Sequence, residues 1–214
     1  MNAQGARTPG HDCPVCPRLV EFRQANRKLE PHWHNGTVPS FGPVDARLLI
    51  VGLAPGLKGA NRTGRPFTGD YAGDLLYATL EKFGWASGTY AREAGDGFRL
   101  VDCRITNAVH CVPPENKPIP QEIAGCRPFL AEEIASMNRL RAILALGSIA
   151  HGSVLRTMGE RAAAYAFRHG AIHTMKGGLL LADSYHCSRY NTNTGKLTPA
   201  MFEAVFEMLR VRLG

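Results

Sequence analysis

The sequence has no long hydrophobic run and no internal repeat. No apolar stretch approaches the roughly 20 residues that a membrane-spanning helix needs, and the first ten residues, MNAQGARTPG, lack the apolar centre of a secretory signal peptide. We therefore expect a protein that is neither secreted nor membrane-spanning, with a cytoplasmic location. In a reducing compartment, clustered cysteines bind metal more often than they form disulfides.

The composition is that of one globular domain, which we expect to span residues 1–214. The chain is 44% hydrophobic and 20% charged, and it is long enough to bury a full core without disulfides. Its net charge of +7 favours a polyanionic partner such as nucleic acid. Several of the positive side chains fall in the loops that carry the motifs described below: Lys58, Arg62, Arg65, Lys117, Arg189 and Lys196.

Four of the six cysteines form two distant pairs. Cys13 and Cys16 have the spacing Cys-x2-Cys, and Cys111 and Cys126 follow much later in the chain. Two thiolates do not complete a four-ligand site, so the two segments must meet in space. Four thiolates suit either zinc or an iron–sulfur cluster, although the second pair lacks the short spacing of a zinc ribbon. The other two cysteines are expected to be ordinary buried thiols: Cys103 and Cys187.

Short apolar segments alternate with helical patterns along the chain. Strands are expected within residues 46–55, 98–109 and 140–146, and a paired or successive strand region is expected at 171–175 and 178–186. Helices are expected over residues 19–30 and 70–83, from residue 120, after Gly147, and from the N-cap Thr198 to the end. The last helix is expected to bury a stripe of five residues: Met201, Val205, Met208, Leu209 and Arg212.

This alternation predicts an α/β fold with a parallel sheet covered on both faces. In such sheets, ligands bind beyond the carboxyl ends of the strands. The loops after Leu53, Val109 and Tyr185 occupy such positions. The first of them, within GLAPGLKGANRTGRPFTGDYAGDLL, is rich in glycine. It lacks the Gly-Lys-Ser/Thr ending of a nucleotide P-loop and the spacing of a dinucleotide fingerprint, so neither motif is indicated.

The whole chain resembles the iron–sulfur uracil-DNA glycosylases, most closely the type-5 group, with the type-4 group as a sibling. The matching stretches are CPVC, GLAP with GANRTGRPFTGD, ITNAVHCVPPENKPIP with CRPFL, and HCSRYNTNTGKLTPAMF, in the family order. The resemblance implies a three-layer α/β/α sandwich around a four-stranded parallel sheet. It also implies a [4Fe–4S] cluster on Cys13, Cys16, Cys111 and Cys126, which joins the N-terminal segment to residues 111–126.

The implied activity is that of a monofunctional DNA glycosylase in base-excision repair. Such an enzyme flips uracil out of double-stranded DNA and hydrolyses its N-glycosidic bond, and the type-5 resemblance extends the range to hypoxanthine or other deaminated bases. The expected partner is double-stranded DNA containing such bases, bound by a monomer that associates with the nucleoid through DNA. No lysine stands at the matched catalytic positions, so no lyase step through a Schiff base is expected.

The resemblance also assigns roles around the base. His186 would stabilise the departing base, Asn107 would recognise it through a donor and an acceptor on one carboxamide, and Phe67 would stack on it. Backbone N–H groups near Ala54 and Gly56 would add contacts. Ordinary structural roles stand beside these: a turn-capping asparagine, core packing by the phenylalanine and a structural histidine.

One position departs from many uracil glycosylases, which carry a carboxylate where this chain has Leu53 and Ala54. The type-5 group also lacks it. Asp70 is the candidate to position water and stabilise the sugar cation, and its rival interpretation is an N-cap for the following helix. Asn61 is a weaker substitute.

Two loops are expected to contact DNA. One is the glycine-rich loop, and the other is the loop that follows His186. In the loop after His186, Arg189 and Tyr190 would fill the gap that the extruded base leaves, and Ser188 would anchor a phosphate. The full set of expected DNA contacts is Arg62, Arg65, Ser188, Arg189, Tyr190 and Asn191.

Two other functions remain compatible with the residues. The missing carboxylate is compatible with a non-catalytic DNA-binding module that recognises flipped bases or abasic sites. The four cysteines are compatible with a zinc-stabilised nucleic-acid hydrolase. Strand breakage by alkali after incubation with a uracil-containing duplex distinguishes a glycosylase from the non-catalytic module. A brown purified protein indicates iron and argues against the zinc-stabilised hydrolase, whereas a colourless, zinc-loaded protein supports it.

Overall fold

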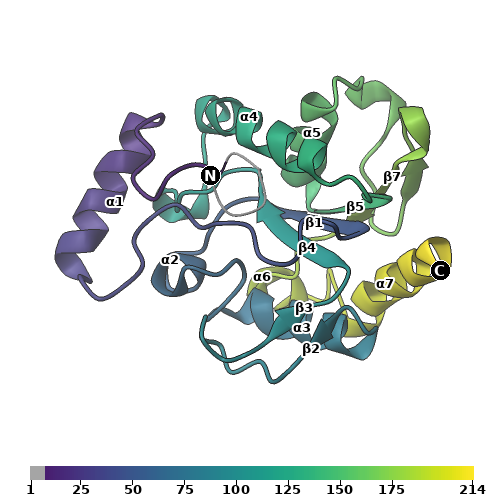
Figure 1. The fold of residues 1–214 in the computed structure, drawn as a ribbon, viewed down its shortest axis with the longest axis horizontal. Helices are drawn as coiled ribbons and strands as arrows, with labels where there is room; N and C mark the ends of the chain where they lie inside the picture. Colours follow the sequence, from purple (N-terminus) through teal and green to yellow (C-terminus); the bar gives the residue numbers. More distant parts are fainter. Residues whose placement is uncertain (1–7) are drawn as a thin grey trace.

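The computed structural model describes residues 8–214, in which a five-stranded sheet lies between two layers of helices (Figure 1). The α/β/α sandwich expected from the sequence is confirmed. The strands, in spatial order, are β4 (Cys103–Asn107), β1 (Leu48–Gly52), β5 (Ala142–Leu146), β7 (Leu180–Ser184) and β6 (Ile172–Thr174).

The sheet is mixed rather than wholly parallel, which corrects the expected four-stranded parallel sheet. Strands β4, β1, β5 and β7 are parallel, and β6 pairs antiparallel with β7 in the register Ile172↔Ala182. The reversal follows from the short turn between them, where Gly177 and Gly178 adopt φ values of 85° and 83°. Because glycine enters this left-handed region without steric cost, the chain folds back at once and adds an edge strand.

Seven α-helices and two short strands complete the described part of the chain. The helices are α1 (Pro17–Leu29), α2 (Ala60–Thr63), α3 (Tyr71–Lys82), α4 (Pro120–Ser136), α5 (Ser148–Thr157), α6 (Arg189–Asn193) and α7 (Pro199–Leu213). Strands β2 (Ala86–Ser87) and β3 (Arg99–Leu100) form a separate antiparallel pair, and 3₁₀ turns occupy Pro114–Asn116, Ala162–Ala164 and Lys176–Gly178. Across residues 8–214, every helix is too short or too polar to cross a lipid bilayer.

The central strands are buried on both faces because helices cover both. In β1, Leu48 and Ile50 belong to the core shared with α3 and α7, whereas Leu49 and Val51 belong to the core shared with α4 and α5. All five residues of β1 are buried. An apolar run without alternation is the pattern that such a doubly covered strand requires.

The segment 98–109, expected to be one strand, divides into β3 and β4. Asp102 lies between them with a φ of 51°, and its carboxylate accepts a hydrogen bond from the Arg47 backbone N–H at 2.8 Å. The left-handed residue turns the chain, so only Cys103–Asn107 continues beside β1.

Helix α7 begins as expected, because the Thr198 hydroxyl accepts a hydrogen bond from the Met201 N–H at 3.2 Å. Its expected buried stripe is only partly correct: Met208 is 36% exposed and Arg212 is also exposed. Aromatic packing decides which face of α7 is buried, since the centroid of the Phe206 ring lies 5.6 Å from that of the Trp85 ring. The buried face consists of Phe202, Val205, Phe206, Leu209 and Leu213.

Candidate active site

A cleft of about 850 Å³ opens beyond the carboxyl ends of β1, β4 and β7. It brings together residues that the sequence places more than a hundred positions apart. Eight of the expected site residues line it: Ala54, Gly56, Phe67, Asp70, Asn107, His186, Ser188 and Arg189. Two polar residues that were not expected from the sequence also line it, Tyr71 and Asn116, because neither lies in a pattern that distinguishes it from a helix start or a turn.

Asn107 is the last residue of β4 and is 2% exposed. Its carbonyl oxygen Oδ1 is buried and has no hydrogen-bond partner among the described residues. A buried acceptor left without a donor costs about 1–3 kcal/mol, so it indicates a site shaped for an incoming donor. Gly52 makes room for this group: a Cβ there would lie 2.3 Å from Asn107 Oδ1 and 2.7 Å from Phe67 Cζ.

Phe67 lines the wall of the cleft, with its ring stacked against that of His186. The two ring centroids are 5.9 Å apart and the planes make an angle of 28°. Phe67 has a φ of 54°, a left-handed conformation that costs a non-glycine residue about 1–2 kcal/mol. Helix α3 closes on its carbonyl so tightly that a Cβ on Gly73 would lie 1.6 Å from the Phe67 oxygen.

His186 follows β7 by two residues, at the end of the strand that faces the cleft. Burial lowers the pKa of His186 to about 4, so the imidazole is neutral at neutral pH. A side chain five residues further along the loop holds the His186 backbone: Asn191 Nδ2 donates to the His186 backbone oxygen at 2.8 Å. Asn191 therefore shapes the loop.

Asp70 is an N-cap and also lines the cleft. Its Oδ1 accepts a hydrogen bond from the Gly73 N–H at 3.1 Å, which confirms the capping interpretation. Its Oδ2 packs against the loop that follows β1: a Cβ added at Gly59 would lie only 2.3 Å from this oxygen. Burial raises the pKa of Asp70 above its usual value. Asn61, the weaker substitute, is 0% exposed, donates to Asn35 Oδ1 at 2.9 Å and does not line the cleft.

Three of the expected DNA contacts lie at the start of α6. Ser188 caps this helix, accepting from the Asn191 N–H at 3.4 Å, so its hydroxyl already has a structural partner. The Arg189 guanidinium lies 5.4 Å from the centroid of the Tyr71 ring. Tyr190 is 74% exposed, as a side chain that enters DNA must be.

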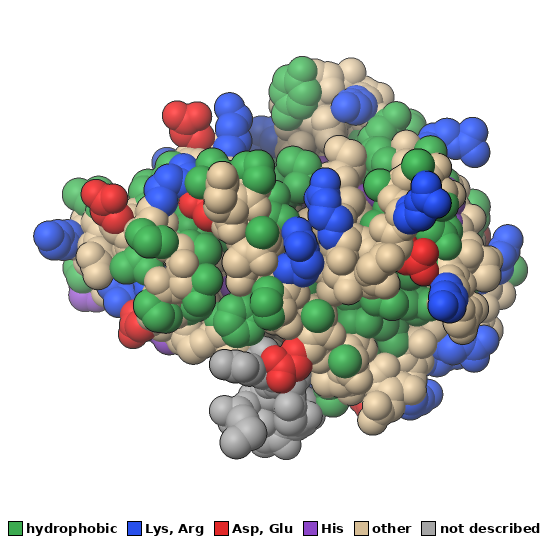
Figure 2. Space-filling model, turned by 90° about the horizontal axis from the view of Figure 1, so that it is seen from above, with side chains coloured by type: hydrophobic (Ala, Val, Ile, Leu, Met, Phe, Trp, Pro, Cys, Tyr) green, Lys and Arg blue, Asp and Glu red, His purple; other side chains and the backbone are tan. Residues whose placement is uncertain are grey.

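The two arginines of the glycine-rich loop, Arg62 and Arg65, differ in exposure and in their ion-pair partners. Arg62 pairs with Glu93 at 2.9 Å and stays partly exposed. Arg65 is 4% exposed and donates through two nitrogens to Asp96, at 2.8 Å each. The expected DNA contact of Arg65 is therefore wrong, since a buried, fully paired guanidinium does not reach a phosphate. Positive side chains are spread over the face seen from above α4 and α5 rather than gathered in one patch (Figure 2).

The two cysteine pairs meet, as expected. Cys13, Cys16, Cys111 and Cys126 line one small cavity at the base of α1 and α4. Two donors point at the sulfurs: the His110 N–H lies 3.4 Å from Cys126 Sγ and Arg23 Nη1 lies 3.6 Å from Cys111 Sγ. The two remaining cysteines are fully buried elsewhere, as expected of structural thiols: Cys103 and Cys187.

Four thiols and a buried guanidinium are the groups that the cavity offers to a cofactor. Within residues 8–214, no three His, Cys, Asp or Glu side chains stand close enough to hold a single metal ion. One zinc ion would require the four sulfurs to lie about 3.8 Å apart, given Zn–S bonds of about 2.3 Å. Arg23 is 3% exposed, and its Nε is buried without a hydrogen-bond partner among the described residues, 4.0 Å from Asp12 Oδ1. The donor set and this buried positive charge fit an anionic iron–thiolate cluster.

A family model described as the Uracil DNA glycosylase superfamily matches residues 39–210. A type-5 uracil-DNA glycosylase of Thermus thermophilus is 45% identical over 206 residues, which are 93% of each chain. A type-5 enzyme of Mycobacterium leprae is 42% identical over 91% of this chain and 88% of its own. A type-4 uracil-DNA glycosylase of Pyrobaculum aerophilum is 35% identical over 71% of this chain and 63% of its own.

The match to the family model spans the segments that build the cleft, from the loop after β1 to the loop after β7. The type-5 relatives exceed this type-4 relative in both identity and coverage, so the resemblance to the type-5 group is confirmed. The chain belongs to the uracil-DNA glycosylase superfamily.

Proposed function

We propose that the protein is a monofunctional DNA glycosylase that extrudes uracil from duplex DNA and hydrolyses its N-glycosidic bond in base-excision repair. The observation that carries this proposal is the cleft in which an unpartnered carboxamide, an aromatic ring and a neutral imidazole face one space. The type-5 relatives bear the same activity in their names.

Base recognition rests on Asn107. The imide edge of uracil presents an N3–H donor beside the O4 acceptor, which complements the Oδ1 acceptor and the Nδ2 donor of one carboxamide. Cytosine presents the reverse pattern at this edge and is rejected. Hypoxanthine presents N1–H beside O6, the same pattern as uracil, and the cleft of about 850 Å³ has room for a purine. The proposed range therefore includes deaminated purines.

Bond cleavage rests on His186. As the C1′–N bond breaks, positive charge develops on the sugar and negative charge on the base. A neutral imidazole donates its N–H to the base O2 and stabilises the anion without having to lose a proton first. The low pKa suits this role, because a ring that is already neutral remains a donor across the physiological range.

Water is held by Asp70 in this proposal. Oδ1 is occupied by the cap of α3, and Oδ2 remains for a water molecule near the sugar. The carboxylate also places negative charge beside the developing sugar cation.

Two substitutions separate the cap from the water-positioning role. Asp70→Ala removes both functions, whereas Asp70→Ser retains a capping oxygen and removes the carboxylate. We expect both variants to slow uracil excision by about tenfold or more, a typical share for one positioned carboxylate. Single-turnover rates with a uracil duplex provide the measurement. If Asp70→Ser matches the wild type, Asp70 serves only as a cap. Thr198→Ala, which removes the cap of α7, controls for lost helix stability.

The DNA duplex is held by the α6 loop and by scattered positive charge. Tyr190 and Arg189 fill the space vacated by the base, and Arg62 contacts a phosphate after release from Glu93. These residues come from one chain, and we propose that a monomer acts on double-stranded DNA. Binding that depends on phosphate contacts weakens steeply with salt.

We further propose that Cys13, Cys16, Cys111 and Cys126 hold a [4Fe–4S] cluster. When bound, the cluster cross-links α1, the loop after β4 and α4 by iron–thiolate bonds, a structural function. Arg23 places its charge against Cys111 and offsets the negative charge of the thiolates.

Substitution of single cysteines tests this assignment. The purified wild-type protein is expected to be brown, to absorb near about 400 nm and to contain about four irons per chain. Cys126→Ser should lose most of the absorption and unfold at a lower temperature. Cys103→Ser and Cys187→Ser change buried thiols outside the cavity and should keep the colour. A colourless protein that contains zinc would contradict the cluster.

A duplex with one uracil tests the proposed activity itself. After incubation with the protein, alkali should break the uracil strand at that site, because the excised base leaves an alkali-labile abasic sugar. A control duplex with cytosine at the same position should stay intact. Tight binding to the uracil duplex without strand breakage would instead indicate a non-catalytic module.

A further inference from the structure

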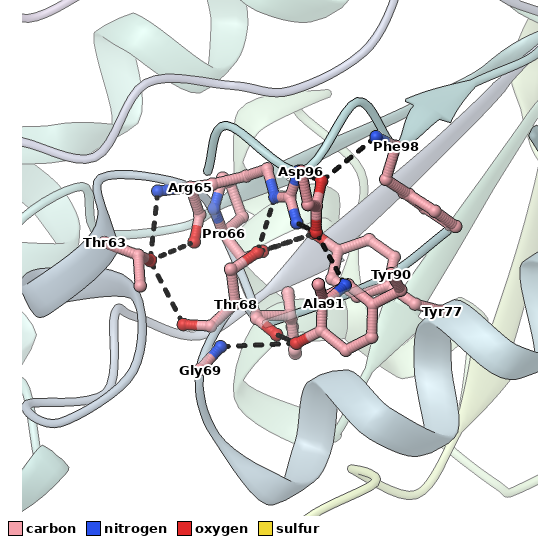
Figure 3. A network of polar contacts seen from close by, with 11 residues as sticks. Thr63, Arg65, Pro66, Thr68, Gly69, Tyr77, Tyr90, Ala91, Asp96 and Phe98 are labelled. Atoms are coloured by element: carbon pink, nitrogen blue, oxygen red, sulfur yellow. Dashed lines mark hydrogen bonds and ion pairs between the residues drawn. The ribbon is translucent and has the colours of Figure 1, made fainter. Parts of the chain in front are cut away.

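A closed polar network joins the segment before α3 to the loop between β2 and β3 (Figure 3). Its centre is Arg65, which donates to both oxygens of Asp96 at 2.8 Å and, through Nε, to Thr68 Oγ1 at 2.7 Å. Both side chains of the ion pair are at most 5% exposed. The guanidinium carbon lies 5.1–6.0 Å from the centroids of four aromatic rings: Phe41, Tyr77, Tyr90 and Phe98.

Asp96 belongs to the loop between β2 and β3, and it folds that loop onto Arg65. Its carboxylate also accepts from the Ala91 N–H at 2.9 Å and from the Phe98 N–H at 3.0 Å. The Arg65 side chain holds the pKa of Asp96 far below its usual range, so the pair is ionic throughout the physiological range. A buried ion pair is stable only when its other donors and acceptors are also paired, as they are here.

The network fixes the backbone on both sides of Phe67. The Tyr77 hydroxyl donates to the Pro66 carbonyl before it. The Tyr90 hydroxyl donates to the Phe67 carbonyl at 3.3 Å and accepts from the Gly69 N–H at 3.2 Å. Phe67 itself has a φ of 54°. A left-handed phenylalanine persists only where its surroundings over-determine it, and these hydroxyls are the surroundings.

The backbone of Phe67 sets the plane of its ring. That ring stacks on His186 with 28° between the planes, at the wall of the cleft. Neither Tyr90 nor Asp96 lines the cleft, so any effect they have on a bound base passes through the backbone that the Tyr90 hydroxyl holds, at Phe67 and at Gly69.

We propose that Tyr90 and Asp96 are positioning residues that hold Phe67 in the orientation in which it stacks on an extruded base. This inference rests on the proposed glycosylase function, which supplies the base. It assigns a role to the loop between β2 and β3: the loop orients the stacking surface from outside the cleft.

Tyr90→Phe is the sharpest test, because it keeps the ring around Arg65 and deletes only the hydroxyl. We expect the single-turnover rate of uracil excision to fall about tenfold, the effect of about one lost hydrogen bond. Affinity for a duplex with non-cleavable 2′-fluoro-deoxyuridine should fall by a similar factor. Affinity for a duplex with a tetrahydrofuran abasic analogue should not change, since it offers no base to stack on. Tyr165→Phe, outside the cleft, is the matched control and should change none of these values.

A double-mutant cycle with Phe67→Ala tests the route of the effect. If Tyr90 acts through Phe67, Tyr90→Phe should cause no further loss once the ring is absent. Multiplicative losses, or equal weakening of uracil and abasic duplexes, would overturn the inference. Asp96→Asn should reproduce the uracil-selective loss, measured at a temperature where circular dichroism shows a folded protein. A wild-type protein that leaves uracil duplexes uncut would contradict the proposed function instead.

Discussion

His186→Ala is expected to lower the single-turnover rate of uracil excision by about 10²–10³-fold, the usual effect of removing one preorganised donor from a developing anion. The side chain lies in the cleft beside Phe67. DNA binding should persist, because the contacts of the α6 loop remain. His173→Ala changes a histidine of the edge strand outside the cleft and provides the control. An unchanged rate for His186→Ala would remove the basis of the proposed mechanism.

The pH dependence provides a second measurement of the same role. Burial lowers the pKa of His186 to about 4 from an unfolded value of about 6.5. The wild-type kcat/KM should therefore show no inflection near pH 6.5 and should fall only as the pH approaches 4. Between these two pH values the unfolded chain binds the proton more tightly, so the free energy of unfolding decreases as the pH falls through this range. His186→Ala should lose this part of the pH dependence of stability. A wild-type inflection near 6.5 would show that the imidazole is not buried in the free enzyme.

Asn107→Ala is expected to lower kcat/KM for uracil by about 10²-fold, because two hydrogen bonds to the imide edge are lost at about 1–1.5 kcal/mol each. The free protein should unfold at the same or a higher temperature, since Asn107 Oδ1 is buried without a partner among the described residues. A turn-capping asparagine would give the opposite result, a loss of stability. Thermal unfolding measured beside the kinetics therefore separates recognition from structure.

Asn107→Asp extends this test to specificity. At neutral pH the carboxylate offers only acceptors, which suit the N4 amino group of cytosine better than the O4 of uracil. We expect the preference for uracil over cytosine to decrease, measured with duplexes that each carry one uracil, hypoxanthine or cytosine. Asn26→Ala is the control, because its side chain donates only within α1, to the Phe22 carbonyl at 2.8 Å. Unaltered preference in Asn107→Asp would contradict the recognition role.

Several features of the site follow from local sequence alone. Thr198 and Asp70 were identifiable as N-caps because an N-cap depends on the next three residues only. Asn107 and His186 were identifiable as neighbours in space because Asn107 ends one buried strand and His186 follows another, and parallel strands end at one edge of the sheet. The convergence of the cysteine pairs followed from the number of ligands that a metal centre needs.

Other features depend on partners that local sequence does not specify. Arg65 lies in a glycine-rich loop among residues typical of DNA contacts, yet Asp96, 31 residues away, pairs with it and buries it. Met208 fits a helical stripe, but the position of Trp85 beside Phe206 rotates that stripe out of the core. Such outcomes are decided by which elements become neighbours, and that is a property of the assembled chain.

The sequence by itself determined the family, the order of the four parallel strands and the five longer helices, and the chemical groups available to the cleft, because motifs and periodicity are properties of contiguous residues. Only the tertiary structure decided three features: the fifth, antiparallel strand, the burial of Arg65, and the hydrogen bonds by which Tyr90 holds the backbone at Phe67. The physical reason is that an ion pair across 31 residues, or a hydroxyl contact across 23, forms only after the sheet and its helices have packed.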